Sequence, residues 1–217
     1  LGEENEERRN DGTTERRNEI AARWSEWREE KARRAAEDRG AGLSSAAVFA
    51  ALSKVAPADA IIAVDVGNNT YSFGRYFECQ RQTVLMSGYL GSIGFGYPAA
   101  MGAWSGAGGR KVIAVTGDGG FGQYMAEQCT AVRYEMDITH VLLNSHELGK
   151  ISKEQRAAKL PVWSTGLTNP DFSAFAKNCG ARGERVEQAD QLERVLGEAI
   201  AHEGPAMVEV LTDPELV

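Results

Sequence analysis

Residues 111–122 read KVIAVTGDGGFG, and they give the clearest indication of the fold. A run of apolar and β-branched residues ends at Thr116, and a single acid, Asp118, follows between glycines. Such a run is typical of a strand that is buried on both faces of a parallel sheet. Burying an unpaired charge is costly. The stretch therefore predicts a central strand whose carboxyl end presents one acid in need of a partner.

The same alternation of apolar runs and helical segments continues from residue 43 onward, and no internal repeat is found. The pattern predicts strands at residues 60–67, 82–88, 111–119, 138–145 and 206–211, and helices at 44–57, 94–109, 122–136, 171–179 and 188–203. Buried strands separated by helices indicate an α/β fold, a mostly parallel sheet with helices on both faces. Ligands of such sheets bind at the carboxyl ends of the strands.

Residues 1–42 have a different composition, because the first 40 residues hold 10 Lys or Arg and 12 Asp or Glu. We expect a charged helix from residue 13 or 14 to about residue 39, ended by a glycine. Three large apolar residues form a narrow stripe that could dock this helix on a larger body, namely Ile20, Trp24 and Trp27. We interpret residues 1–42 as a linker or tail from a preceding domain, rather than a partner-binding helix, and residues 43–217 as the main domain.

Bulk composition excludes several classes of protein. The formal net charge of -7 leaves no basic surface for nucleic acid, and no apolar run approaches the roughly 20 residues of a membrane helix. The three cysteines, Cys79, Cys129 and Cys179, are far apart in the sequence and form no CxxC pair. This argues against a disulfide framework or a thiolate metal site and favours a reducing, cytoplasmic location. Because the chain begins at Leu1 rather than methionine, we expect it to be a piece of a longer protein.

Glycine-rich and polar segments follow the predicted strands, at residues 65–69, 87–94, 117–120 and 144–147. Glycines let backbone N–H groups approach a ligand, and the start of a helix favours a phosphate. An acid in such a turn would repel phosphate unless a cation lay between them. Asp118 therefore indicates Mg²⁺, which prefers oxygen ligands, and Asn144 and Ser145 offer neutral oxygens nearby. Asp-Gly turns are common, so the turn alone is weak support for a site.

The spacing of these segments adds specificity. Gly117-Asp118-Gly119 and Asn144, with 24 residues between Gly119 and Asn144, resemble the thiamine diphosphate signature, in which GDG precedes a pair of asparagines. The segment SGYLGSIGFGYPAAMGA at 87–103 resembles a conserved stretch of the acetolactate synthase, pyruvate oxidase and 2-oxoacid decarboxylase superfamily. Residues 60–77 and 146–155 are also similar to its cofactor-binding domain. The resemblance covers about residues 43–213.

This resemblance implies the thiamine diphosphate-binding fold and the C-terminal diphosphate-binding (PP) domain of an enzyme that uses thiamine diphosphate and Mg²⁺. The enzyme would act on 2-oxoacids such as pyruvate and be acetolactate synthase-like or pyruvate oxidase-like, with KISKEQ at 150–155 favouring the oxidase branch slightly. Where the enzyme uses flavin adenine dinucleotide (FAD), that cofactor would bind a domain outside this sequence. We also expect a homo-oligomer.

The resemblance assigns the metal to Asp118 and the main-chain carbonyl of Glu147, together with position 145. The family normally has asparagine at that position, and this chain has Ser145. Serine offers a neutral oxygen with a shorter reach, so the metal would shift, take an extra water or recruit Asn144. We therefore expect weaker retention of the cofactor than is usual in the family.

Two catalytic contacts are implied on the loop after the second predicted strand. The carbonyl of Gly91 would accept from the 4′-amino group of the cofactor. Ile93 would impose the V shape of the cofactor through its stiff β-branched side chain and donate its N–H to the pyrimidine ring. The remaining expected cofactor contacts are Gly67, Asn68, Ser92, Gly117, Gly119, Gly120, Leu148 and Gly149.

Other chemically capable side chains receive mostly structural interpretations. We expect His140 and His202 to be structural, and the side chain of His146 to point away from the metal loop. Glu154 is equally compatible with the substrate end of the pocket and with a solvated helix position. Cys129 and Trp163 are interpreted as packing residues, with a subunit contact as the alternative for Trp163.

The family's reaction also requires a glutamate from a separate pyrimidine-binding domain, and nothing in this sequence replaces that domain. We therefore expect the chain alone to be inactive. Two alternatives stay open: the PP subunit of a split 2-oxoacid decarboxylase, and a non-catalytic relative in which Ser145 is an early sign of decay. A nicotinamide-binding domain is the weakest interpretation, because no acid follows GYLGSIGFG by about 20 residues at a strand end.

Overall fold

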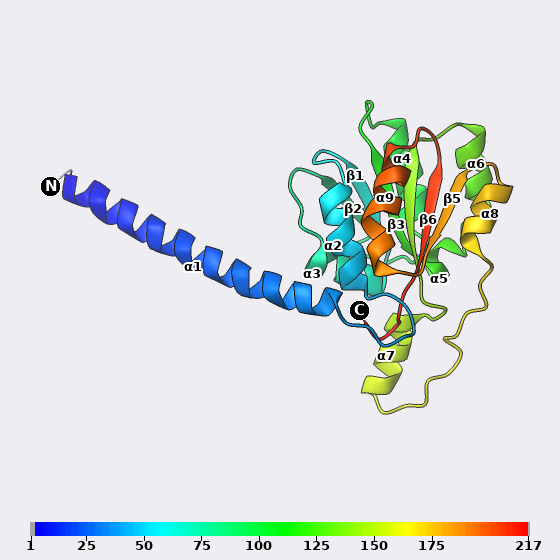
Figure 1. Ribbon diagram of the computed structural model, residues 1–217, viewed down its shortest axis with the longest axis horizontal. Coiled ribbons are helices and arrows are strands. Elements are labelled where there is room, and N and C mark those ends of the chain that lie inside the picture. The colour runs from blue at the N-terminus through cyan, green and yellow to red at the C-terminus, as the bar shows by residue number, and fades with distance from the viewer. Residues whose placement is uncertain (1–2, 217) are drawn as a thin grey trace.

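A six-stranded, all-parallel sheet forms the centre of the computed structural model, which describes residues 3–216 (Figure 1). The spatial order of the strands is β2-β1-β3-β4-β6-β5. Their bounds are Ile61–Val64 for β1, Thr83–Met86 for β2, Val112–Gly117 for β3, Ile138–Asn144 for β4, Arg182–Val186 for β5 and Ala206–Leu211 for β6. The expected α/β class with a parallel sheet is confirmed.

Helices cover both faces of this sheet. Side chains of α2 (Ser45–Val55), α3 (Asn68–Tyr76) and α9 (Leu192–Ala201) pack on one face. Those of α4 (Gly96–Ser105), α5 (Asp118–Phe121), α6 (Glu127–Arg133) and α8 (Phe172–Asn178) pack on the other. Successive residues of a strand point to opposite faces, so Ile62 and Val64 join the first core and Ile61 and Ala63 the second.

The strand order creates a switch point between β1 and β3. The chain leaves β1 to form β2 on one side and then returns to form β3 on the other. In the register of the sheet, Val64 pairs with Val115 and Gly117 pairs with Leu143. The segments that follow β1, β3 and β4 therefore emerge side by side at one edge, where α7 (Gly149–Ala157) also begins. Such switch points are the usual ligand sites of open α/β sheets.

Several expected elements differ from those observed. The helix predicted over 122–136 is observed only in part, as α6: the chain first forms the short α5, and a turn that starts at Gly122 separates the two helices, because glycine weakens helix formation. The helix predicted at 94–109 is limited to α4. The edge strand β5 was not predicted, because its sequence RGERV is polar and only Gly183 and Val186 are buried. The expected helix at 188–203 is observed as the 3₁₀ helix η1 (Ala189–Gln191) followed by α9.

The N-terminal helix α1 (Glu3–Ala35) projects from the sheet domain in Figure 1. This helix begins before residue 13, where the sequence predicted its start, and it ends before residue 39, where the sequence predicted its end. The expected docking stripe is only partly correct, because Ile20 and Trp24 remain 50% and 47% exposed. Trp27 alone of the three docks, stacking on Tyr76 at 6.4 Å between ring centroids and donating its indole N–H to the carbonyl oxygen of Arg75 at 3.2 Å.

An ion pair fastens the same end of α1. The ammonium of Lys31, which is 8% exposed, lies 2.6 Å from the carboxylate of Glu78. Within residues 3–216, no helix combines the length and the apolar composition needed to cross a bilayer.

Candidate cofactor site

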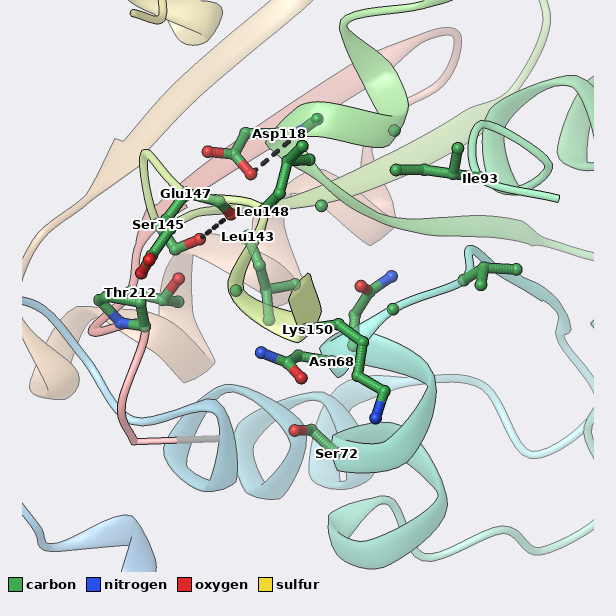
Figure 2. Close-up of a pocket in the computed structure, with 18 of the residues that line it drawn as sticks. Asn68, Ser72, Ile93, Asp118, Leu143, Ser145, Glu147, Leu148, Lys150 and Thr212 are labelled. Atoms are coloured by element: carbon green, nitrogen blue, oxygen red, sulfur yellow. Dashed lines mark hydrogen bonds between the residues drawn. The ribbon is translucent and has the colours of Figure 1, made fainter. Parts of the chain in front are cut away.

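A pocket opens at the carboxyl ends of β1, β3 and β4, with about 650 Å³ of empty space that includes part of its open mouth (Figure 2). Its lining contains eleven of the residues singled out from the sequence: Gly67, Asn68, Ile93, Gly117, Asp118, Gly119, Gly120, Ser145, Glu147, Leu148 and Gly149. Three others, Gly91, Ser92 and Asn144, are not part of the lining. The fold thus brings together four segments that are far apart in the sequence.

Asp118 is the buried acid of this pocket, 4% exposed. Its Oδ1 accepts a hydrogen bond from the N–H of Gly119 at 3.0 Å, and its Oδ2 accepts one from the Asn169 amide at 2.7 Å. Burial raises the pKa of the Asp118 carboxyl, while the Asn169 amide and the backbone N–H groups of Gly119 and His146 oppose that rise. These hydrogen-bond donors are neutral amide groups, so the carboxylate is solvated by the protein without being neutralised. A cation in the pocket would remove that cost.

The loop after β4 presents two neutral oxygens next to each other. The hydroxyl of Ser145 donates to the main-chain carbonyl of Glu147 at 3.2 Å, as Figure 2 shows. Adjacent oxygen ligands of an octahedral Mg²⁺, each at about 2.1 Å, lie about 3 Å apart. The separation in the structure is therefore close to the one that two neighbouring ligands of Mg²⁺ require.

A second segment braces this loop. Glu147 pairs with Gly166 in an antiparallel bridge, the N–H of Leu148 donates to the carbonyl of Thr165 at 2.8 Å, and the N–H of Leu167 donates to that of His146 at 2.8 Å. His146 adopts a left-handed φ of 56°, and its exposed side chain lies outside the pocket lining. The loop therefore lines the pocket with Ser145 and Glu147, whereas the imidazole of His146 lies outside it.

Asn169 is a site residue that the sequence did not reveal. Its amide nitrogen donates to Asp118 at 2.7 Å and to the side-chain oxygen of Asn144 at 2.8 Å. Asn144 in turn donates to the fully buried Glu209 at 2.7 Å. The side chain of Asn144 is thus committed to a buried network beside the pocket. An asparagine in an irregular segment is no signal in itself, and only the contact across 51 residues identifies it.

Asp65 is the second buried acid at a strand end. Its carboxylate is fully buried and accepts from the N–H of Val66 at 2.7 Å and from that of Gly94 at 2.9 Å. Burial raises the pKa of Asp65, and these N–H groups oppose the rise. A Cβ on Gly120 would lie 2.3 Å from Asp65 Oδ2, and one on Gly96 would lie 2.9 Å from Asp65 Cβ. Asp65 therefore holds the loop that carries Ile93 against the GDGG turn.

Two helices of nine residues begin at the pocket and add positive potential. Helix α3 starts at Asn68, after Gly67 with a φ of 113°, and α7 starts at Gly149. Neither has an acid in its first turn. Free N–H groups and the helix dipole favour an anion at such positions. The two helix starts are close together, because a Cβ on Gly149 would lie 2.8 Å from the side-chain nitrogen of Asn68.

The mouth of the pocket carries exposed apolar side chains. Ile93 is 42% exposed, and Tyr89 and Leu90 on the same loop are 97% and 80% exposed. Gly91 lies between them with a left-handed φ of 62°, a conformation that favours glycine. Large apolar side chains clustered on one exposed loop are typical of a surface that another protein segment covers.

The other candidate side chains lie outside the pocket. His140 is buried, bonds Thr116 Oγ1 at 2.7 Å, and burial lowers its pKa to about 3, so it is neutral and structural as expected. Glu154 is exposed and ion-paired with Lys150. Trp163 is 78% exposed, so it does not pack inside this chain. Among residues 3–216, no three His, Cys, Asp or Glu side chains gather as a metal cluster, which leaves Asp118 with neutral oxygens.

Lining residues that the sequence did not indicate include a basic side chain and two hydroxyls. Lys150 follows Gly149 at the start of α7, and Ser72 and Thr212 come from α3 and the segment after β6. Figure 2 shows Lys150 close to Asn68. The position of Lys150, directly after a glycine at a helix start, is the one signal that the sequence held for it.

Comparison with known proteins gives a consistent result. Residues 65–210, more than half of the chain, match the family model "Thiamine pyrophosphate enzyme, C-terminal TPP binding domain". A Bacillus subtilis protein named for containing thiamine pyrophosphate, YdaP, is 38% identical over 77% of this chain and 29% of its own length. The large subunit of acetolactate synthase isozyme 2 from Escherichia coli is 32% identical over 75% of this chain and 30% of its own.

A solved structure agrees with these matches. The thiamine diphosphate-dependent 4-hydroxybenzoylformate decarboxylase of Rhodococcus jostii superposes with a TM-score of 0.75 at 27% identity, covering 82% of this chain and 34% of that one. The chain thus spans about a third of the length of the relatives that it matches.

The packing of Asp65 leads to a test of the site's framework. We expect Gly120→Ala to lower the free energy of unfolding by about 1–3 kcal/mol, because the new methyl group must displace a buried carboxylate. Gly102→Ala on α4 is the matched control, since a Cβ there meets nothing within 4 Å, and it should be neutral or stabilise by up to about 1 kcal/mol. Denaturant unfolding measures both. Equal midpoints for Gly120→Ala and wild type would contradict this packing constraint.

Proposed function

This chain belongs to the thiamine pyrophosphate enzyme family, and it matches the C-terminal domain that binds thiamine pyrophosphate (TPP). We propose that the pocket binds this cofactor, which is also called thiamine diphosphate, through Mg²⁺. One observation carries the proposal: a buried, un-neutralised Asp118 lies beside two helix starts that favour an anion. An acid and an anion site are compatible when a divalent cation joins them. We further propose that residues 43–217 form the binding domain and that residues 1–42 are a linker or tail.

The donor set fits Mg²⁺. Asp118 offers a carboxylate oxygen, Ser145 a hydroxyl and Glu147 a main-chain carbonyl, and Mg²⁺ prefers such hard oxygen ligands together with phosphate and water. Asn144 would bind the metal through its Oδ1, which already accepts hydrogen bonds from the Asn169 amide at 2.8 Å and from the N–H of His146 at 3.3 Å. Ser145 already lies 3.2 Å from the Glu147 carbonyl, so these two oxygens need little movement to share one cation.

Backbone groups would hold the diphosphate. Residues of the 117–120 turn and of the α3 and α7 starts, with Gly67, Asn68, Leu148 and Gly149 among them, line the pocket. The N–H of Leu148 is already bonded to the carbonyl of Thr165, so the N–H groups of the other residues would face the phosphates. Lys150 supplies a positive charge in the same lining. Backbone N–H groups cannot lose their protons near neutral pH, so this lining would stay attractive to phosphate over a wide pH range.

The loop at 91–96 would orient the rest of the cofactor. Ile93 lines the pocket with a β-branched side chain, and Gly91 and Ser92 precede it on the same loop. Asp65 fixes the loop through the N–H of Gly94. When bound, thiamine diphosphate supplies the carbon nucleophile that this family uses on 2-oxoacids. The role of this chain would be to hold that cofactor in a defined shape at the mouth of the pocket.

We propose that a pyrimidine-binding domain covers this mouth, supplied by a longer polypeptide or by another subunit of a homo-oligomer. The exposed Tyr89, Leu90 and Ile93 support this, as does the match to only about a third of each relative. The whole enzyme would act on a 2-oxoacid such as pyruvate, as an acetolactate synthase-like or oxidase-like protein. A split decarboxylase and a non-catalytic relative are the alternatives, and FAD, if used, would bind another domain.

The isolated chain provides the first test. We expect no release of CO₂ from pyruvate by this chain with thiamine diphosphate and Mg²⁺, because the acid that activates the cofactor would lie on the covering domain. Labelled pyruvate gives the required sensitivity, and the Asp118→Asn chain sets the background. Turnover by the wild-type chain above that background would contradict the proposed incompleteness.

Removal of the buried charge tests the metal site. Asp118→Asn should weaken binding of thiamine diphosphate in Mg²⁺ by at least about 100-fold in calorimetry. The same variant without cofactor should melt no lower than wild type, because it no longer buries a carboxylate whose pKa burial raises. Asp190→Asn, an exposed position, is the control for the change in net charge. Unchanged affinity in Asp118→Asn would overturn the metal assignment.

The serine at position 145 leads to a gain-of-affinity test. Asparagine carries its oxygen farther from the backbone, so Ser145→Asn should tighten binding by about 10-fold, with the gain seen only when Mg²⁺ is present. Ser105→Asn, at the exposed end of α4, is the matched control. If Ser145→Asn binds as wild type does, then the serine is a full substitute as a metal ligand.

A further inference from the structure

Two of the three cysteines, although 50 residues apart in the sequence, lie against each other. Cys129 is on α6, and Cys179 directly follows α8. The thiol of Cys129 donates to the sulfur of Cys179, with 3.6 Å between the two Sγ atoms. Figure 1 shows α6 and α8 next to each other at one side of the sheet. Both thiols are free, Cys129 exposed and Cys179 half-buried.

Packing on both sides holds this pair in place. Ala131 of α6 and Ala176 of α8 are fully buried in the same core cluster on the sheet. Gly180, which ends α8 with a φ of 96°, lies so close to α6 that a Cβ would be 3.3 Å from Val132 Cγ1. The N–H of Cys179 donates to the carbonyls of Phe175 and Ala176 at 3.0 and 3.2 Å. The closeness of the two sulfurs thus follows from helix packing, rather than from two loose loops.

We propose that Cys129 and Cys179 are a modification site that forms a reversible disulfide by exchange with a small-molecule disulfide such as oxidised glutathione. Bonding requires the sulfurs to move from 3.6 Å to about 2.05 Å, which rotation about the Cα–Cβ bonds of both side chains can supply. The third cysteine, Cys79, is exposed between α3 and β2 and has no part in the pair.

The exchange proceeds in two balanced steps. The thiolate of the more exposed Cys129 attacks one sulfur of oxidised glutathione, which forms a mixed disulfide and releases one glutathione thiolate. Cys179 gives its proton to solvent and attacks the Cys129 sulfur, which forms the protein disulfide and releases the second glutathione. The two protein thiols lose two electrons, and one oxidised glutathione becomes two reduced molecules. Burial and the neighbouring Cys129 raise the pKa of Cys179 to about 11, so the second step should accelerate with rising pH.

The cross-link would join the two segments that lead away from the pocket. Helix α6 follows Asp118 along the chain, and α8 follows Asn169. The amide nitrogen of Asn169 lies 2.7 Å from the carboxylate of Asp118. A bond between residues 129 and 179 closes a loop of about 50 residues, which restricts the unfolded chain. The oxidised protein should therefore melt at least about 5 °C higher than the reduced protein. The proposal does not depend on which ligand the pocket binds.

The test uses the folded chain, incubated with oxidised glutathione or with dithiothreitol and then alkylated. We expect Cys129 and Cys179 in the oxidised sample to lose both alkylatable thiols and about 2 Da of mass between them, with no glutathione retained at those positions. Exposed Cys79 can separately carry one glutathione adduct, which the Cys79→Ser chain removes. Peptide mapping should identify a Cys129–Cys179 link. Cys79→Ser is the matched control and should form the same link.

Single replacements and a denatured sample complete the design. Cys129→Ser and Cys179→Ser should carry only glutathione adducts, and their melting in dithiothreitol reports whether they fold. In denaturant the wild type should lose its preference for this pair, because the preference arises from the fold. Stable glutathione adducts on folded wild type in place of the link, or links to Cys79 in equal amount, would overturn the proposal.

Discussion

Parallel pairing of β1, β3 and β4 is the constraint on which the site depends. Pairing of Val64 with Val115 and of Gly117 with Leu143 makes the three strands end at one edge. These three strands are buried on both faces, and polar side chains inside them, such as Thr116 and His140, bond one another within the core. Polar groups that can meet a ligand are therefore placed where the strands stop. The residues that directly follow these strands are thus the ones that can bind a ligand. The change of direction between β1 and β3 opens the space that these residues line.

The two buried acids at this edge, Asp65 and Asp118, are stabilised in different ways. Asp65 accepts backbone N–H groups from Val66 and Gly94 and is enclosed by the close approach of Gly96 and Gly120. It is a structural clamp with no room for a ligand. Asp118 accepts from Gly119 and Asn169 but faces the pocket. The charge of Asp65 thus stabilises the framework through backbone hydrogen bonds. The charge of Asp118 stays accessible to a ligand, and its burial lowers the stability of the ligand-free chain.

Local pattern predicted the regular elements best where burial is complete. Strands β3, β4 and β6 and the helix α2, capped by Ser44, were predicted from apolar runs and a cap. Prediction failed where local sequence and environment disagree. The polar β5 is a strand because β6 offers it a partner at the sheet edge. Helix α1 docks only through its C-terminal part, with Trp27 and Lys31, because the helix continues beyond the sheet domain.

Periodicity and spacing along the chain were enough to predict the fold class, the strand-end glycines and the acid of the candidate site. The contacts of Asn169 with Asp118 and Asn144, of Asn144 with Glu209, and of Cys129 with Cys179 arise only when the chain is folded. Contacts between residues 25 to 65 apart depend on how helices pack over a common sheet. No local preference of the sequence predicts these contacts. In the unfolded chain each of these side chains is solvated by water, and only packing brings its partner within reach.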